Sequence, residues 1–142
     1  MRMIRTDLIA MLADHKVKVS AARLKILQMC VKSDLPLDVQ AVATQLGSDA
    51  HLATVYRTLD RFVAAGLLER VDFQEGKFRY EYKRAHHHHA ICEACGAVQD
   101  IENDDLSGLE SAVRRESGFI VQRHTLEFFG LCNKCHLKGH HV

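Results

Sequence analysis

The sequence predicts an α+β protein made of two unlike parts, and three observations support this. Up to Gly66 the apolar residues recur at helical spacing, whereas from Leu67 onward they alternate with polar residues as they do in strands. Two CxxC pairs, separated by 36 residues, lie near the beginning and near the end of the second part of the chain. We therefore expect a helical first part that ends in a β-hairpin and a smaller, mixed α/β second part held together by its cysteines.

Four helices are predicted in the first part. The first carries the apolar residues of segment 4–12, and Ser20 is a candidate N-cap for the second. Asp38 is a candidate N-cap for a short third helix, and the fourth helix is predicted from about His51 to Ala65. The fourth helix has one apolar stripe, made of Leu52, Val55, Leu59, Phe62 and Val63.

The third and fourth helices form a candidate helix-turn-helix, and the hairpin after them is its candidate wing. The apolar stripe leaves polar and basic side chains on the outer face of the fourth helix, where they suit phosphates and base edges. The candidate DNA-binding residues on this helix and in the loop before the second helix are Lys16, Thr54, Tyr56, Arg57 and Arg61. Lys18, Arg70, Lys77 and Arg79 are further candidates for phosphate contact. The alternative is a helical subdomain with a solvated charged face.

Composition narrows the functional classes. The net charge of the 142-residue chain is +1, so DNA binding must depend on where the charges lie. The chain has no apolar run long enough to span a membrane, and its first residues lack the apolar stretch of a signal peptide. We expect a cytoplasmic protein whose thiols stay reduced, so that paired CxxC motifs indicate metal before disulfide.

The second part is predicted to contain strand, helix and strands. The expected elements are a strand at 97–101, a helix at 104–117 with Leu106, Leu109 and Val113 facing inward, and strands at 119–123 and 125–129. A part this small is marginally stable alone, so a metal or a dimer contact is expected to support it.

The four paired cysteines are candidate ligands of one structural metal ion. Cys92, Cys95, Cys132 and Cys135 can present four thiolates to a tetrahedral ion, for which Zn²⁺ is the usual occupant. A redox dithiol or coincidence is the alternative. The fifth cysteine, Cys30, lies on the apolar face of the second helix and is expected to be a buried, small apolar residue.

Four consecutive histidines, His86 to His89, precede the first CxxC pair. Because side chains alternate along an extended segment, His87 and His89 are expected to face one way and His86 and His88 the other. One run can then serve two sites. Glu81 and Asp100 are candidate partners of the first pair, and carboxylate–imidazole sets suit Zn²⁺, Fe²⁺ or Mn²⁺.

His124 is a candidate partner of the second pair, His86 and His88. Either Glu110 or the acidic cluster Glu102, Asp104 and Asp105 could complete that set. The alternative for the whole run is adventitious metal affinity.

Taken together, these motifs resemble the ferric uptake regulator family of bacterial metal-dependent repressors. The resemblance covers nearly the whole chain. It rests on the stretch TVYRTL at 54–59, Arg79-Tyr80-Glu81, the histidine run with the first CxxCG, and His124 followed by the second CxxC pair.

The resemblance implies a winged-helix DNA-binding domain at 1–83, a hinge with the histidine run at 84–90, and a dimerisation and metal-binding domain at 91–142. It implies homodimers that bind double-stranded operator DNA when a regulatory divalent metal (Zn²⁺, Fe²⁺ or Mn²⁺) is loaded beside the structural Zn²⁺. The four cysteines match the structural site. Glu81, His87 and His89 match the sensory site, and Asp100 matches an aspartate used there by some peroxide-sensing members. His86, His88 and His124 match the second site, and Tyr56 and Arg57 match the DNA-contacting positions.

The sequence departs from the family pattern at several positions. Members that sense iron or peroxide usually take a histidine ligand from near residue 36, where this chain has Pro36. Either Asp34 or Asp38 substitutes for it, or the sensory site lacks this ligand. Ser107 stands where a glutamate ligand of the second site is common, and His88 stands where an aspartate is typical. The cysteine that zinc sensors often place before the run is absent.

The sequence therefore predicts a metal-responsive repressor of metal uptake or homeostasis genes that senses zinc or iron. The alternatives are a peroxide-responsive regulator of the same family and a metal-buffering protein that does not bind DNA. An enzyme is not expected, because a metallohydrolase needs an open coordination position and an acid/base partner, and the spacing offers none. No small-molecule substrate or membrane is expected as a partner.

Overall fold

The computed structural model describes residues 3–102 and 105–140 of the chain. The chain divides into two compact units, Met1–Arg84 and Ala85–Val142. The predicted α+β class is confirmed, with a helical first unit that includes a hairpin and a mixed second unit.

The helices of the first unit begin and end close to the predicted positions. They are α1 (Arg5–Asp14), α2 (Ala21–Lys32), α3 (Val39–Leu46), the 3₁₀ turn η1 (Gly47–Asp49) and α4 (Leu52–Ala64). Both predicted N-caps are confirmed. Ser20 Oγ accepts from the backbone N–H of Arg23 at 3.3 Å, and Asp38 Oδ1 accepts from that of Ala41 at 2.7 Å.

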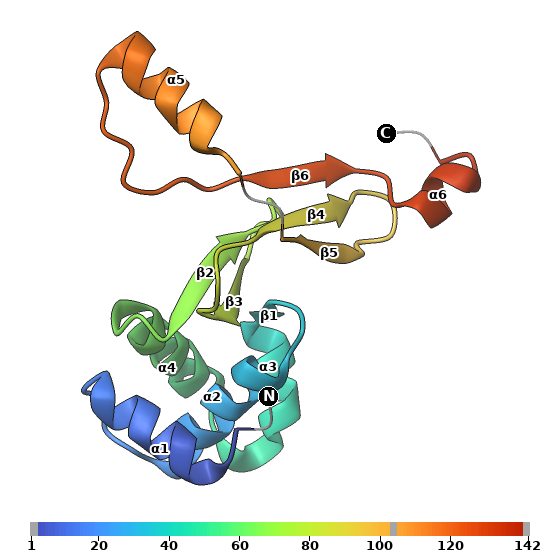
Figure 1. The fold of residues 1–142 in the computed structure, drawn as a ribbon. Helices are drawn as coiled ribbons and strands as arrows, with labels where there is room; N and C mark the ends of the chain where they lie inside the picture. The colour runs from blue at the N-terminus through green and yellow to red at the C-terminus, as the bar shows by residue number, and fades with distance from the viewer. Residues whose placement is uncertain (1–2, 103–104, 141–142) are drawn as a thin grey trace. The chain divides into compact units, whose positions relative to one another are not determined.

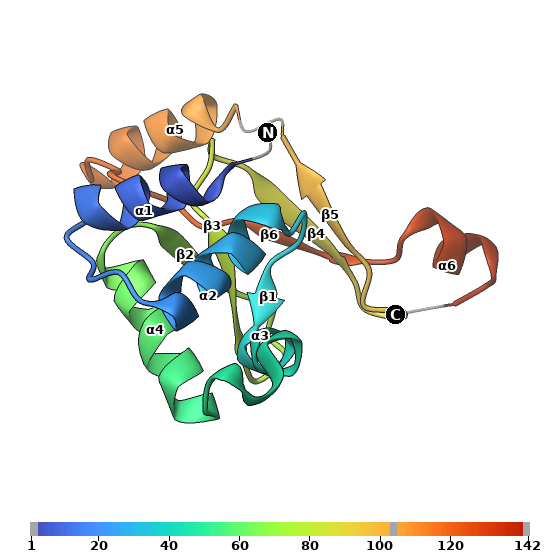
Figure 2. The same cartoon turned by 90° about the horizontal axis from the view of Figure 1, so that it is seen from below.

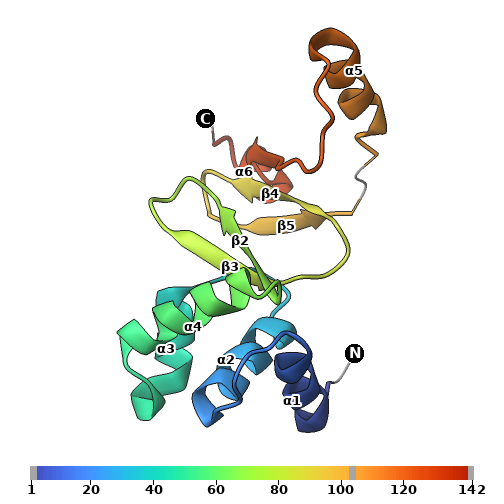
Figure 3. The same cartoon turned by 90° about the vertical axis from the view of Figure 1, so that its left-hand side faces the viewer.

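The predicted hairpin is part of a three-stranded sheet whose order is β1-β3-β2. Its two strands β2 and β3 lie side by side in Figure 3. Strands β2 (Leu68–Asp72) and β3 (Phe78–Tyr82) pair antiparallel, with Val71 opposite Arg79. Strand β1 (Leu37–Asp38) pairs with the other edge of β3. The sequence did not predict β1, because two residues are too few to show an alternating pattern.

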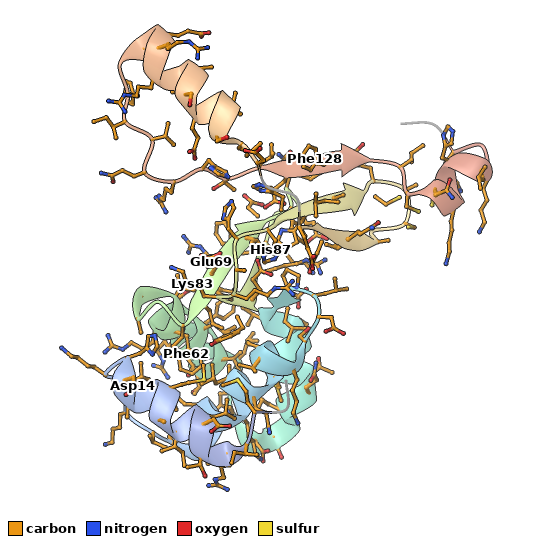
Figure 4. All side chains as sticks on the ribbon, in the orientation of Figure 1. Asp14, Phe62, Glu69, Lys83, His87 and Phe128 are labelled. Atoms are coloured by element: carbon orange, nitrogen blue, oxygen red, sulfur yellow. The ribbon has the colours of Figure 1, made fainter. Side chains whose placement is uncertain are left out.

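One continuous apolar core holds the first unit together. Phe62 of α4 is fully buried and lies amid the helices of this unit in Figure 4. Its buried neighbours in the core include Leu12, Ile26, Leu27, Val42, Val55, Leu59, Leu67 and Tyr80. One member of the predicted apolar stripe is not buried. Leu52 is 47% exposed, because it is the first residue of α4 and lies at the edge of the core.

The second unit is a three-stranded sheet with a helix near each end. Its strands are β4 (His88–Cys92), β5 (Val98–Ile101) and β6 (Glu127–Gly130), in the order β5-β4-β6 with β6 parallel to β4. Its helices, α5 (Ser107–Ser117) and α6 (Asn133–Leu137), lie at opposite ends of this sheet (Figures 1 and 2). The last two residues of the histidine run, His88 and His89, belong to β4.

Two predictions for the second unit need correction. The predicted strand at 119–123 is wrong: the described segment 118–126 forms no strand, and Phe119 and Ile120 are 71% and 74% exposed. No residue of α5 is buried, so its apolar residues Leu109 and Val113 do not face an interior. A helix face is buried only against another surface, and the described part of this unit supplies none to α5. The predicted start of this helix, Asp104, lies outside the described residues.

Within the described residues, no helix is long and apolar enough to cross a membrane.

Candidate metal centres and DNA-binding surface

The ends of β4 and β6 bring the four paired cysteines together. Cys92 is the last residue of β4, and Cys95 follows in a turn that Gly96 closes with a φ of 73°, a conformation that favours glycine. Cys132 is the N-cap residue of α6, and Cys135 lies within that helix. The backbone N–H of Glu93 donates to Gly130 O at 2.8 Å, which ties the two CxxC segments to each other.

The spacing of the sulfurs fits a tetrahedral ion. All four Sγ atoms lie within 4.8 Å of one another, and Cys95 Sγ lies 3.8 Å from Cys132 Sγ. A tetrahedron of four sulfurs with Zn–S bonds of about 2.3 Å has S···S edges of about 3.8 Å. The predicted four-cysteine cluster is therefore present in the second unit.

Two of these thiols, those of Cys92 and Cys135, differ in how readily they ionise. Backbone N–H groups of Cys132 and Cys95 face the Cys92 sulfur and lower the pKa of that thiol to about 6. Burial, together with hydrogen bonds to the other cysteines, raises the pKa of the Cys135 thiol to about 12. Four thiolates this close together repel one another, so complete deprotonation requires a bound cation.

The histidine run sends its side chains to two sides. The ring centroids of His86 and His88 lie 4.8 Å apart, and those of His87 and His89 also lie 4.8 Å apart. These are the i, i+2 pairs that an extended backbone places on the same face.

His124 joins the first of these pairs. The ligand nitrogens of His86, His88 and His124 lie within 4.8 Å of one another, and Nε2 of His86 lies 2.8 Å from Nε2 of His124. Glu110, which was predicted to complete this set, lies behind His124: its Oε1 is 2.9 Å from His124 Nδ1. A carboxylate that accepts the Nδ1 proton directs the Nε2 lone pair toward the other histidines. Glu110 therefore orients a ligand in this arrangement.

The acidic residues Glu102, Asp104 and Asp105 are weaker candidates than Glu110 for completing the set of His86, His88 and His124. Ser107, at the start of α5, donates its hydroxyl to Asp105 Oδ1 at 2.6 Å. This side-chain hydrogen bond, with a second one from the Ser107 backbone, holds the pKa of Asp105 below its usual value. Glu102 is exposed, and Asp104 lies outside the described residues.

His89 lies between two carboxylates that come from the flanking strands. In the sheet register, His89 of β4 is opposite Asp100 of β5 on one side and Glu127 of β6 on the other. Its Nδ1 is 3.2 Å from Glu127 Oε2, and its Nε2 is 3.8 Å from Asp100 Oδ1. His89 itself is 2% exposed. Asp100 was a predicted ligand, whereas Glu127 was not predicted, because nothing local in the sequence shows that β6 runs parallel to β4.

The other predicted ligands belong to the first unit. Glu81 lies on β3, opposite Glu69 of β2. Pro36, at the position where the sequence resemblance implies a histidine ligand, is fully buried. Asp38 is engaged by both carboxylate oxygens, since Oδ1 caps α3 and Oδ2 pairs with the Lys77 ammonium. Of the two aspartates that could replace the missing histidine, Asp34 is exposed and Asp38 is already committed to the fold.

Helix α4 presents the predicted DNA-binding face. Tyr56 is 49% exposed, Arg57 is exposed and Thr54 is half-buried, whereas Val55 and Leu59 anchor the opposite face in the core. The Tyr80 hydroxyl lies 3.2 Å from Asp60 Oδ1, which fixes α4 to the middle strand of the sheet. An anchored helix with exposed polar and basic groups is the arrangement that enters a DNA major groove.

Several of the predicted basic contacts already have partners in the chain. Arg61 Nη2 donates to the backbone carbonyl of Lys16 at 3.5 Å. On the wing, Arg79 forms a two-pronged ion pair with Glu75, with both N···O distances 2.8 Å, and Arg70 stacks 4.3 Å over the Phe78 ring. Lys77 pairs with Asp38. Lys16 itself is exposed.

Comparison with known proteins gives one consistent result. The family model described as "Ferric uptake regulator family" matches residues 14–129. The ferric uptake regulation protein of Neisseria gonorrhoeae is 36% identical over 136 residues, which are 92% of this chain and 94% of that protein.

Solved structures agree with the sequence comparison. The Vibrio cholerae ferric uptake regulator superposes with a TM-score of 0.74 at 29% identity, over 87% of this chain and 98% of that one. A zinc-bound manganese uptake regulator superposes with a TM-score of 0.68 at 28% identity, over 88% of this chain and 98% of that one.

Proposed function

Because the chain belongs to the ferric uptake regulator family of metal-responsive transcriptional regulators, we propose that it represses metal-uptake genes by binding operator DNA as a homodimer when Zn²⁺ or Fe²⁺ is loaded. The observation that carries this proposal is the division of one histidine run into two sets beside a separate four-cysteine cluster. A protein that only needed a metal to fold would need the cysteines alone.

In this proposal the four cysteines hold a structural Zn²⁺. The S···S distance of 3.8 Å supports that ion, and the four-thiolate donor set leaves no open position for chemistry. The backbone N–H groups that lower the Cys92 pKa prepare the first thiolate.

The sensory set in this proposal is Glu81, His87, His89 and Asp100. The contribution of Glu81 rests on the sequence resemblance, and that of Asp100 is supported by its position opposite His89. Glu127 accepts the Nδ1 proton of His89, which makes Nε2 the nitrogen that coordinates. With Pro36 in place of a histidine and Asp38 engaged in the fold, the set has four donors, a number that suits tetrahedral Zn²⁺ better than six-coordinate Fe²⁺ or Mn²⁺.

The second regulatory site consists of His86, His88 and His124, with Glu110 as the carboxylate that orients His124. Ser107 cannot replace a glutamate ligand here, because its hydroxyl serves as a donor to Asp105. A site of three imidazoles and no direct carboxylate favours Zn²⁺ over harder ions.

DNA contacts are assigned to the outer face of α4 and the loop before α2. Tyr56 and Arg57 read base edges and phosphates in the major groove, Thr54 contacts a thymine methyl or a phosphate, and Lys16 contacts phosphate. The exposure of Tyr56 and Arg57 on an anchored helix supports these roles.

A homodimer is the partner that the second unit requires in this proposal. Its large exposed apolar residues include Leu109, Val113, Phe119, Ile120, Phe128 and Phe129. Apolar surface of this kind in a small unit marks an interface with another chain.

The proposal is tested by measuring duplex binding by fluorescence anisotropy. Chelator-treated full-length protein is titrated with Zn²⁺, Mn²⁺ and anaerobic Fe²⁺, against DNA from upstream of its own gene. We expect tight binding only with metal, at the lowest free concentration for Zn²⁺. Selective tightening by Fe²⁺ or Mn²⁺ would overturn the four-donor zinc assignment and direct attention to Asp34. Equal binding with and without metal would overturn the regulatory proposal itself.

The sensory assignment has its own variants. Combining Glu81→Ala with His87→Ala should abolish the metal-stimulated part of DNA binding while leaving the structural ion and the dimer in place. His140→Ala removes an exposed histidine near the C-terminus and is the matched control, with wild-type behaviour expected. Metal stimulation that survives in the double variant contradicts the assignment.

A further inference from the structure

Building on the proposed function, we infer that Arg23 and Arg61 are positioning residues for DNA binding. They hold the loop 16–18 in one conformation, so that Lys16 and Lys18 meet the DNA backbone without having to be ordered during binding. This inference assigns Arg61 a different role from the direct DNA contact expected from the sequence.

The end of α1 fixes the middle of this loop. The backbone N–H of Lys16 donates to Ala13 O at 2.9 Å, and that of Val17 donates to Leu12 O at 2.8 Å. This pair of bonds is the Schellman ending of a helix, and its usual apolar contact is available because Val17 and Leu12 are both buried. Val17 therefore anchors the loop in the core, and the lysines on either side of it are exposed.

Lys16 occupies a backbone conformation that favours glycine. Its φ is +55°, in the left-handed region where a side chain on Cα is disfavoured. Helices that end this way usually have glycine at this position, so a lysine there costs stability. A residue kept at such a position is a sign that its side chain has a use.

Arginines from two different helices hold the carbonyl groups of the two lysines. Arg23 of α2 donates through Nη1 to Lys18 O at 2.7 Å, and Arg61 of α4 donates through Nη2 to Lys16 O at 3.5 Å. Arg61 lies one turn after Arg57, so the same helix that reads DNA also holds the loop. Within the described residues neither lysine ammonium forms an ion pair.

This arrangement has two consequences for a phosphate. Carbonyl oxygens that faced an approaching phosphate would repel it, and the two guanidinium groups offset that partial negative charge. The loop is also ordered before DNA arrives, which lowers the entropic cost of using it. The lysines carry the positive charge that meets the phosphates, and the arginines hold the loop that positions these lysines.

The experiment is a double-mutant cycle on metal-loaded full-length protein, with operator affinity measured by anisotropy at several salt concentrations. The first cycle combines Arg61→Gln with Lys16→Gln, and the second combines Arg23→Gln with Lys18→Gln. Each lysine substitution is expected to lower the slope of log affinity against log salt by about 0.9. Each arginine substitution is expected to weaken binding severalfold in the wild-type background and to have no further effect once its lysine is gone. Lys32→Gln, which removes an exposed lysine from the end of α2, is the matched control and should leave the slope unchanged.

Additive losses in both cycles would overturn the inference, because they are the result expected if the arginines touch DNA themselves. Lys16→Gly adds a readout that needs no DNA: it should raise Tm while weakening operator binding as much as Lys16→Gln does. A lower Tm for Lys16→Gly would contradict the strained-lysine argument. Wild-type protein that binds no duplex at all overturns the proposed function and this inference together, whereas tight wild-type binding with additive losses overturns this inference alone.

Discussion

The two units of this chain are stabilised in different ways. In the first unit, α1 to α4 and the sheet share one apolar core in which Leu12, Leu59 and Phe62 are fully buried. In the second unit, the buried side chains are few, and they include His88, His89, Cys92 and Cys135. Its largest apolar residues, by contrast, are exposed.

This difference shows which unit depends on partners. Burial of apolar surface supplies most of the free energy of folding in small domains, and the first unit has enough of it for a core of its own. In the second unit, potential metal ligands occupy buried positions of the kind that leucine or phenylalanine usually fills. We therefore expect core substitutions to lower the stability of the first unit. The second unit should instead lose stability when metal is removed or when the protein is diluted.

The largest effect is expected from loss of the cysteine cluster. Cys92→Ser or Cys135→Ser should unfold the second unit, because structural Zn²⁺ sites contribute apparent binding free energies of about 10–16 kcal/mol. Limited proteolysis should then remove the second unit and leave a resistant fragment close to residues 1–84, and the zinc content should fall by one ion per chain. Cys30→Ala is the control, since this buried thiol lies outside the cluster. A second unit that resists protease equally in wild type and Cys92→Ser would contradict the comparison.

The next effect separates a core phenylalanine from an exposed one. Phe62→Ala should lower the free energy of unfolding of the first unit by about 3–5 kcal/mol, because it leaves a cavity in a closed core. Phe128, which lies on β6 in Figure 4, is 48% exposed. Phe128→Ala should change the stability of the isolated chain by less than about 1 kcal/mol but should weaken the dimer. Urea unfolding and sedimentation at several concentrations measure the two quantities. Equal losses of stability at concentrations where the chain is monomeric would show that Phe128 is a core residue.

A smaller effect is expected from the carboxylate behind His89. Glu127→Gln should weaken the sensory metal by about 10- to 100-fold, the usual cost of losing a carboxylate that orients a histidine ligand. Competition with a chelating indicator measures this affinity, and the zinc held by the cysteines should be unaffected. Glu116→Gln, at an exposed position on α5, is the matched control. Unchanged affinity in Glu127→Gln would show that the contact has no part in metal binding.

The smallest effect concerns an ion pair of the first unit. Lys77 beside Asp38 holds the pKa of that carboxyl below its usual value, so the pair stabilises the fold above about pH 4. Asp38→Asn keeps an N-cap but removes the charge, and should cost less than about 1 kcal/mol at pH 7. The difference between wild type and variant should disappear as the pH falls through the lowered pKa, because the wild-type carboxyl then becomes neutral. Urea unfolding between pH 3 and pH 7 tests this, and a difference that stays constant would exclude the ion pair as its cause.

Prediction from the sequence succeeded where the signal was local. The four helices of the first unit, the hairpin and the N-caps Ser20 and Asp38 follow from short-range periodicity and capping chemistry, and the structure confirms them. The short helix α6 was not predicted. Prediction failed where one segment depends on another that is distant in the sequence. Strand β1 exists because β3 pairs with it, and the segment 119–123 is not a strand because no described strand of this chain pairs with it.

The same division holds for the candidate sites. Spacing alone identified the four cysteines and the two faces of the histidine run, because CxxC geometry and strand alternation are properties of adjacent residues. Spacing could not show that Glu127 would lie beside His89, or that Glu110 would lie behind His124.

The sequence by itself determined which residues can bind metal, where the four helices of the first unit and the hairpin lie, and which face of α4 is polar. Only the tertiary structure decided which carboxylate orients each histidine, which arginine holds the loop at Lys16 and Lys18, and which apolar residues of the second unit remain exposed. The physical reason is the range of the interactions. Periodicity, capping and metal-ligand spacing act over a few residues, whereas strand pairing and side-chain hydrogen bonds between elements require the whole chain to have folded.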